Sequence, residues 1–408
     1  MSNARFITKK WQEGFLLQNK YVSVVLKVSM MIYILGEDVK RFLPIVQTFQ
    51  KHHVPFRIIH AGEAGMDLSI DPQRFQGCIL YNRTSPSARV RGFKGAIDFA
   101  RSILDLFRAQ GVSKIVHDTS ALDLEGSKAA QVIACLRFGL DVPQTYIAHG
   151  KDALFEIAIQ KLRLPRSAVL ASMSGPGNKQ AWYVKADRGG SSHDVVRCTS
   201  LKNVMTAAER TDSPSMIWVV QREVMGRYAL SVSLTREQQE IRARGAFDAA
   251  ATKFHIKRTH YRLEIIDHKV LYVLRVQSTG MTRDLCPCAD DKNAVGTSFE
   301  ITDDEVQRIV GKDRWFAFVD GCLDLTREYQ IFAASFEFAL GYVGYEDQSQ
   351  PPKMYVFDIA CGNTNYNEAA ELRARLPPTR RGYEVIASYL MEQLETFQKV
   401  KQDDVISI

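Results

Sequence analysis

The sequence contains no apolar run that reaches the roughly 18 residues of a membrane-spanning helix. The first part of the chain holds an apolar patch from Tyr21 to Val28, but it lacks the order of a secretory signal peptide. The seven cysteines are odd in number and irregularly spaced, which argues against a disulfide framework and favours a reducing compartment. These absences predict a cytoplasmic protein without a membrane partner, whose residues 1–30 form a loose N-terminal extension.

Several enzyme motifs are also missing. Neither the P-loop pattern G-x-x-x-x-G-K-[ST] nor the dinucleotide pattern G-x-G-x-x-G occurs, and H-E-x-x-H and G-x-S-x-G are absent as well. The pair Cys286-Pro287-Cys288 has no second pair at zinc-site spacing. The net charge of +7 is not gathered into a basic stripe with aromatic residues, so we expect no nucleic-acid partner. The charge instead favours an anionic substrate such as a nucleotide.

Apolar strands and amphipathic helices alternate near the start of the chain. A length of 408 residues suggests two or three packed units. The predicted elements are strands at 31–36, 56–60, 77–81 and 113–117, with helices at 37–52 and 93–110. This alternation is typical of a doubly wound parallel sheet, so we expect an α/β domain at residues 31–118.

Beyond residue 118 the pattern changes to antiparallel strands with fewer helices. A short turn at Asp267-His268 between two apolar runs predicts a hairpin. The predicted strands are 181–186, 215–220, 261–266, 269–276, 336–345 and 354–359, and the predicted helices are 125–138, 300–309, 325–332 and 382–399. This part of the chain is therefore expected to contain mainly antiparallel strands together with helices.

The most informative stretch runs from Val356 to Asn367. An apolar strand delivers Asp358, and three asparagines follow within nine residues of it. Oxygen ligands at this density suit a hard cation such as Mg²⁺ that holds nucleotide phosphates. Glu337 lies inside another apolar strand, where a carboxylate rarely stays buried without a partner, and a metal ion shared with Asp358 would supply one.

A candidate phosphate cradle follows the apolar run Trp182–Ala186. Lys185 precedes the loop Arg188-Gly189-Gly190-Ser191-Ser192, in which glycine backbone and serine hydroxyls can bind phosphate oxygens. Taken alone, this loop fits a polar hairpin with a surface lysine better. Lys128 begins a predicted helix, where the helix dipole and a lysine both favour anions, but an ordinary first-turn residue is the simpler interpretation by itself.

Two arginines lie on the strands of the predicted hairpin. Arg262 and Arg275 could clamp a phosphoryl group as charge develops on it. A surface ion pair with Glu264 or Asp267 explains them equally well at this stage.

Seven segments, in this order, resemble the ATP-grasp superfamily, and more narrowly the branch of RimK-type glutamate ligases and glutathione synthetase. They are Tyr81–Ala88, Leu124–Gln131 with Val142–Thr145, Val184-Lys185, Val219–Val224, Tyr261–Glu264, Leu271–Val276 with Leu285–Pro287, and Asp358–Asn367.

The resemblance implies an ATP-grasp fold, in which two α+β subdomains enclose ATP behind an N-terminal doubly wound parallel-sheet domain. The implied units are 31–118 (Rossmann-like), 119–225 (phosphate loop and hinge), 226–376 (metal site) and 377–408 (C-terminal helix and tail).

The resemblance also assigns roles to individual residues. ATP would be bound by Lys128, Lys185, Arg188, Gly189, Gly190, Ser191, Ser192, Gln221, Glu223 and Val224. Mg²⁺, or Mn²⁺ as an alternative, would be held by Glu337, Asp358 and Asn363, with Glu346 competing with Glu337. Arg262 and Arg275 would stabilise the transferring phosphoryl group.

The implied reaction joins a carboxylate to an amine through an acyl phosphate, using ATP. The substrates would be amino acids or peptides, or a peptide or protein tail, and the resemblance is compatible with a homodimer. Ala360 replaces the asparagine that the family carries two residues after the metal carboxylate, and the loop continues as Ser191-Ser192-His193-Asp194 where more glycine is usual. A non-catalytic nucleotide-binding protein with the same fold is therefore the alternative.

Overall fold

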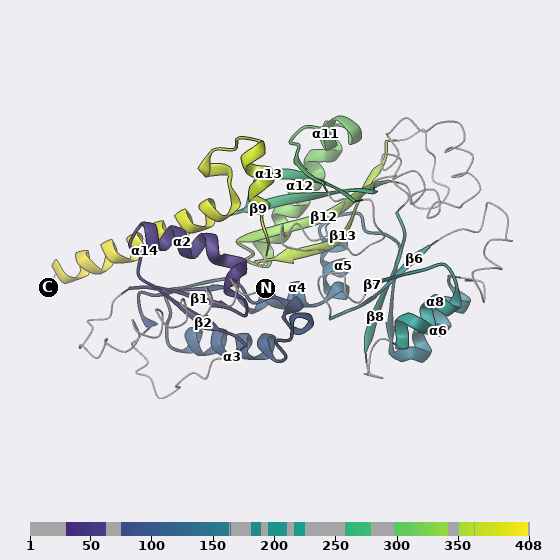
Figure 1. Cartoon of the computed structure of the whole chain (residues 1–408), viewed down its shortest axis with the longest axis horizontal. Coiled ribbons are helices and arrows are strands. Elements are labelled where there is room, and N and C mark those ends of the chain that lie inside the picture. Colours follow the sequence, from purple (N-terminus) through teal and green to yellow (C-terminus); the bar gives the residue numbers. More distant parts are fainter. Residues whose placement is uncertain are drawn as a thin grey trace, which may run out of the picture.

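The structure is a computed structural model that describes residues 30–62, 75–162, 164, 181–188, 195–209, 216–224, 258–278, 298–341, 351–362 and 364–406. Its strands form three sheets, one parallel and two antiparallel, each accompanied by helices (Figure 1). Within the described residues, no helix combines the length and the apolar character needed to cross a membrane.

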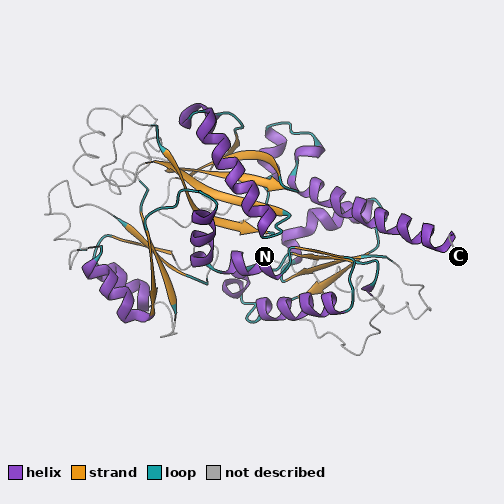
Figure 2. Cartoon of the chain, turned by 180° about the vertical axis from the view of Figure 1, so that it is seen from behind, coloured by secondary structure: helices purple, strands orange, loops and turns teal. Residues whose placement is uncertain are grey.

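The N-terminal sheet is parallel, with strand order β2-β1-β3-β4. Side chains alternate between its faces, so one face packs on α3 and the other on α2 and on the C-terminal helix α14 (Figure 2). The bounds are β1 Ile32–Gly36, η1 Val39–Phe42, α2 Leu43–Lys51, β2 Phe56–His60, β3 Ile79–Asn82, η3 Pro86–Arg91, α3 Ala96–Ala109, β4 Lys114–Val116 and α14 Gly382–Ile406. The predicted doubly wound α/β arrangement is confirmed.

The largest sheet is antiparallel, with strand order β11-β10-β9-β12-β13. One face packs against α12, and the β10 part of the other face packs against α14. The bounds are β9 Arg258–Ile266, β10 Lys269–Ser278, β11 Ser298–Ile301, α11 Glu305–Val310, α12 Lys312–Glu328, β12 Ala333–Gly341, β13 Lys353–Cys361, α13 Glu368–Arg373 and η6 Pro378–Arg380.

A smaller antiparallel sheet has the strand order β5-β8-β6-β7. Two helices, α6 and α8, cover one of its faces (Figure 1). The bounds are α4 Thr119–Gly126, α5 Lys128–Arg137, β5 Thr145–His149, α6 Gly150–Gln160, β6 Trp182–Ala186, β7 Val195–Cys198, α8 Leu201–Glu209 and β8 Ile217–Arg222. The helices α4 and α5 contact β13 of the larger sheet, and the N-terminus of α5 also bonds Asp187, directly after β6 of the smaller sheet.

Two predicted helices were misplaced. The segment 300–309 begins as the edge strand β11, because Ser298–Ile301 pairs with β10, and only its second part is helical. The helix predicted at 325–332 is instead α12, which ends at Glu328. Its buried face includes Trp315, Phe318, Cys322 and Leu325, a helical spacing that was overlooked among the charged residues of this segment.

Candidate nucleotide and metal site

Three predicted site residues from three different elements meet at one place. Lys128, at the first position of α5, forms an ion pair with Asp358 on β13. Lys185, on β6, donates from Nζ to the carbonyl oxygen of Phe357 at 3.2 Å and to Oε1 of Gln221 at 2.6 Å. The fold therefore gathers two cations around the strand that carries Asp358, although the three residues are far apart in the sequence.

Two carboxylates face each other beside these lysines. Glu337 on β12 and Asp358 on β13 are directly opposite in the antiparallel register, so their side chains share one face of the sheet. The register shifts immediately beyond this pair, which leaves Phe357 as the extra residue of a β-bulge. Bulges often redirect a side chain at the rim of a sheet, and here the bulge adjoins Asp358.

Arg262 lies opposite Glu337 on the neighbouring strand β9. Its Nε is 3.5 Å from a Glu337 oxygen and donates to Ser335 Oγ at 2.9 Å, and its Nη2 is 3.3 Å from Glu264 Oε1. The guanidinium is almost fully buried, so its direction is fixed by these partners. Asp358, Glu337 and Arg262 therefore form a row of charged side chains across three neighbouring strands.

The two facing carboxylates fit a hard divalent cation. Mg²⁺ is usually held by one or two carboxylates together with phosphate oxygens and water, so a full cage of protein ligands is not required. The residues that the structure describes contain no cluster of three or more His, Cys, Asp or Glu around one metal position. Asn363 and the competing Glu346 lie outside the described residues.

Burial alters the protonation of the site. Desolvation lowers the pKa of Lys185 to about 8, an effect that Asp358 opposes and Lys128 reinforces. Burial by itself would lower the pKa of Lys128 as well. The pairing with Asp358 outweighs burial, so the pKa of Lys128 is raised. Burial raises the pKa of Glu125, which lies behind Asp358, to about 8, partly offset by the Cys361 N–H group and Lys128. The site is thus a coupled set of charges rather than isolated groups.

The N-terminus of α5 is already occupied by a carboxylate from the chain itself. Asp187 accepts hydrogen bonds from Ser127 Oγ at 2.9 Å and from the Ala129 N–H group at 2.8 Å, and its own carbonyl accepts from the Lys128 N–H group. The expectation that this helix terminus attracts phosphate through its backbone is therefore not supported, and the Lys128 ammonium remains as the group that can do so. The sequence analysis did not predict this cap by Asp187, because it depends on how β6 and α5 pack together.

Two further predicted nucleotide-binding residues, Gln221 and Glu223, lie on and directly after β8 of the smaller sheet, whose Gln221 side faces away from α6 and α8. Gln221 on β8 donates to Thr145 Oγ1 at 3.3 Å, while Glu223 accepts hydrogen bonds from Tyr183 and Arg197. Ile147 and Ile217 stay 47% and 39% exposed next to this polar group, which offers an apolar surface that a flat base can cover.

Other predicted site residues are less closely placed. Val224 is half-buried and Arg188 is exposed, and the loop residues Gly189, Gly190, Ser191 and Ser192 lie outside the described residues.

Arg275 is not brought together with the other predicted residues. It pairs in register with Tyr261, whereas Arg262 pairs with Leu274, the residue before Arg275, so the two arginines point to opposite faces of the sheet. Arg275 forms ion pairs with Glu300 and Glu305 on its own face. The opposite directions of the two arginines could not be predicted from the sequence, because they depend on the register between β9 and β10.

The sequence matches no family model, and no curated protein matches it. Solved structures do match. The D-alanine–D-alanine ligase from Bacillus anthracis complexed with ATP has a TM-score of 0.52 at 11% identity, with 92% of this chain and 99% of that chain covered. The ATP-grasp ligase PsnB, complexed with a minimal precursor, has a TM-score of 0.51 at 12% identity and coverages of 89% and 99%.

The D-cycloserine synthetase DcsG has a TM-score of 0.50 at 13% identity, with 89% of this chain and 99% of that chain covered. These matches cover about nine tenths of this chain, including its parallel sheet and both antiparallel sheets, in agreement with the mixed α/β and α+β fold that the resemblance implied. The protein therefore has an ATP-grasp fold.

Proposed function

We propose that the protein is an ATP- and Mg²⁺-dependent ligase that joins a carboxylate to an amine through an acyl phosphate. The observation that carries the proposal is the meeting of Lys128 and Lys185 with Glu337 and Asp358 on an ATP-grasp fold. A triphosphate and a divalent cation need cationic and acidic groups side by side, which is the arrangement of these four residues.

In the proposed reaction, Lys128 and Lys185 bind phosphate oxygens of ATP. Lys128 exchanges its ion pair with Asp358 for a phosphate oxygen, so the same step releases the Asp358 carboxylate. Glu337 and Asp358, with Asn363 as the predicted third ligand, would hold Mg²⁺, which neutralises phosphate charge when bound. Arg262, held between Glu337 and Glu264, stabilises the negative charge of the phosphoryl group as it transfers.

The chemistry needs no protein nucleophile. An oxygen of the substrate carboxylate attacks the γ-phosphorus, the bond to ADP breaks, and an acyl phosphate forms. The amine then attacks the acyl carbon, phosphate leaves, and the amine loses a proton as the amide forms. The protein contributes positioning and charge. The substrate class that we propose is amino acids or peptides, because the ATP-grasp ligase PsnB was solved with a minimal precursor and the D-alanine–D-alanine ligase joins amino acids.

Phosphate release from ATP, measured with mixtures of amino acids and short peptides, tests the proposal. We expect ADP and phosphate to appear in equal amounts and a new amide product to be detected by mass spectrometry. Asp358→Asn should abolish turnover without unfolding the protein, since the Asp358 side chain is partly exposed. Asp324→Asn, an exposed carboxylate on α12, is the matched control and should be silent.

The non-catalytic alternative rests on Ala360, which lies opposite Ser335 on the same face as Glu337 and Asp358. Its methyl group offers no ligand atom to a cation. Measurable binding of Mg-ATP without phosphate release for any substrate mixture would favour this alternative over a ligase.

A further inference from the structure

The backbone that follows Asp358 is held by side chains from distant parts of the chain. Gln131 on α5 bonds both backbone groups of Ile359, accepting from its N–H group at 3.1 Å and donating to its carbonyl oxygen at 2.8 Å. Glu125 on α4 accepts from the Cys361 N–H group at 3.0 Å. The outer edge of β13, beside which the described residues place no further strand, is thus paired by side chains.

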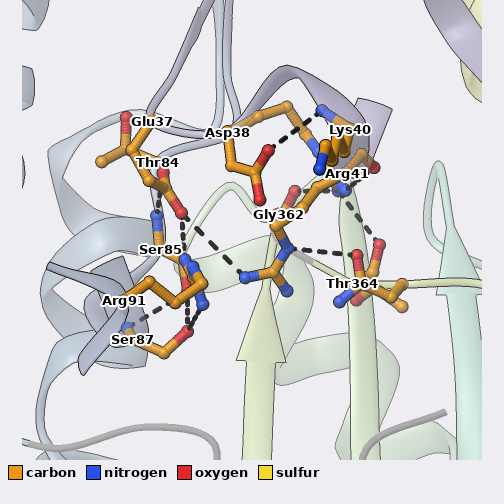
Figure 3. Close-up of polar contacts among 12 residues, drawn as sticks. Glu37, Asp38, Lys40, Arg41, Thr84, Ser85, Ser87, Arg91, Gly362 and Thr364 are labelled. Atoms are coloured by element: carbon orange, nitrogen blue, oxygen red, sulfur yellow. Dashed lines mark hydrogen bonds and ion pairs between the residues drawn. The ribbon is translucent and has the colours of Figure 1, made fainter. Parts of the chain in front are cut away.

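A further side chain that holds this backbone comes from the N-terminal domain. Arg83, directly after β3, donates from Nη1 to the carbonyl oxygens of Gly362 at 2.7 Å and Thr364 at 3.1 Å, and from Nη2 to that of Arg41 at 3.3 Å. Figure 3 shows Gly362 and Thr364 beside Arg41 of this domain. The Arg83 guanidinium therefore connects the backbone directly after β13 to the N-terminal domain by hydrogen bonds.

The charge of Arg83 is unusual for a merely structural link. The residue is 2% exposed, and no carboxylate in the described part of the chain lies within ion-pair distance of it. A buried cation without an ionic partner is costly, and here three backbone carbonyls compensate for it. Because all three acceptors are backbone atoms, the guanidinium fixes chain position rather than any side chain.

A second contact from the same domain supports the end of β13 sterically. The His117 ring, which follows β4, packs so closely under Gly362 that a Cβ atom at that position would overlap it. Gly362 also has a φ of +81°, which favours glycine. The ring is itself fixed, because Nδ1 donates to the Asn82 carbonyl and Nε2 accepts from the Ala333 N–H group at 2.9 Å.

These anchors matter because the β12–β13 ladder is irregular at Asp358. The bulge at Phe357 interrupts the pairing, so the ladder alone leaves the direction of the Asp358 side chain weakly fixed. We propose that Arg83 is a positioning residue for the divalent-cation site: through Gly362 and Thr364 it holds the end of β13, and thereby the Asp358–Glu337 pair. This inference rests on the proposed function of that pair as a cation site.

The test measures cation binding and nucleotide binding separately. Mn²⁺ is titrated by electron paramagnetic resonance against the protein saturated with a non-hydrolysable ATP analogue, and the affinity for the same analogue is measured in EDTA. Arg83→Lys keeps the charge but cannot reach three carbonyls. We expect its dissociation constant for Mn²⁺ to rise about tenfold or more, the range seen when groups supporting metal ligands are removed, while the affinity in EDTA changes by less than about twofold. Arg101→Lys, a partly exposed arginine on α3 of the same domain, is the control and should change neither value.

Two results would overturn the inference. One is unchanged Mn²⁺ affinity in a folded Arg83→Lys protein, and the other is an equal loss of both affinities, which signals general loosening. In Gly362→Ala the added methyl group would overlap the His117 ring. This variant must also lose Mn²⁺ affinity while it keeps its nucleotide affinity in EDTA, and it decides the question if Arg83→Lys does not fold. If the wild-type protein itself binds no Mn²⁺ with the nucleotide, the proposed function fails, an outcome distinct from either of these.

Discussion

At the scale of single residues, the site is governed by charges taken out of water. Lys185 is the clearest case, because burial lowers its pKa to about 8, well below the ordinary value for lysine. A lysine that must be cationic to bind phosphate then limits the pH range of the site. The neighbouring Asp358 and Lys128 act on the same group in opposite directions, so any change at one of the three shifts the others.

Nucleotide affinity should therefore fall as the pH rises. The Lys185 ammonium of the free protein is lost above a pH of about 8, so we expect the dissociation constant for ATP to increase by up to about tenfold per pH unit above it. Fluorescent-nucleotide titrations between neutral pH and about pH 9.5 measure this. Lys185→Arg, which stays charged, should remove the pH dependence. A flat profile in the wild-type protein would contradict the role given to Lys185.

A second effect of burial concerns acid stability. Burial lowers the pKa of His117 and of His260 to about 3, so the unfolded chain binds protons below the ordinary histidine pKa while the folded chain does not. The free energy of unfolding therefore decreases as the pH falls from about 6.5 towards 3. At pH 5 each of the two histidines lowers it by about 2 kcal/mol relative to neutral pH.

Urea unfolding at pH 7 and pH 5 measures this loss. His260→Leu should reduce the difference between the two pH values by about 2 kcal/mol, because the ring Nε2 has no partner among the described residues and the leucine does not titrate. His52→Gln, an exposed histidine, should leave the difference unchanged. A pH difference that survives His260→Leu intact would show that other groups cause it.

At the scale of elements, the lysines are aligned by the contact between β6 and α5. Asp187 follows Lys185 by two residues and caps the helix that begins with Lys128. Asp187→Ala removes the acceptor for Ser127 and Ala129, so we expect it to cost about 1–2 kcal/mol of stability and to weaken ATP binding.

Chemical denaturation and ATP titration of the same variants check this prediction. Asp187→Asn keeps one acceptor oxygen and should lose less of both properties. The matched control is Asp98→Ala, a carboxylate in the first turn of α3 whose side chain is 84% exposed. If Asp187→Ala and Asp98→Ala had the same stability and the same affinity for ATP, Asp187 would not align Lys128 and Lys185.

The success of sequence reasoning followed the strength of the local pattern. The strands at 56–60 and 182–186 and the hairpin around Asp267-His268 were placed within a few residues, because their apolar periodicity and turn are local signals. Lys185 and Asp358 could be proposed as partners only through the resemblance, since their meeting depends on how two sheets pack. The opposite directions of Arg262 and Arg275, the cap by Asp187 and the clamp by Arg83 depend on register and on long-range contacts that no local pattern encodes.

At the scale of the whole molecule, the N-terminal domain and the larger sheet share one apolar core. The C-terminal helix α14 lies between them (Figure 2). Its Leu390 is fully buried and belongs to the apolar cluster that also contains side chains of the parallel sheet and of β10. Leu390→Ala should therefore destabilise both units together by about 2–5 kcal/mol. Glu395→Ala, exposed on the same helix, should have little effect. Two separate unfolding transitions, of which only one shifts in the Leu390 variant, would refute a shared core.

The central claim is that a triphosphate and a divalent cation meet between β6, α5 and β13. A crystal structure with Mn²⁺ and a non-hydrolysable ATP analogue tests it most directly, because the anomalous signal locates the ion independently of the nucleotide. We expect an ion bound between Glu337 and Asp358, with phosphate oxygens in contact with Lys128 and Lys185. A nucleotide bound elsewhere, or an ion that touches neither carboxylate, would contradict it.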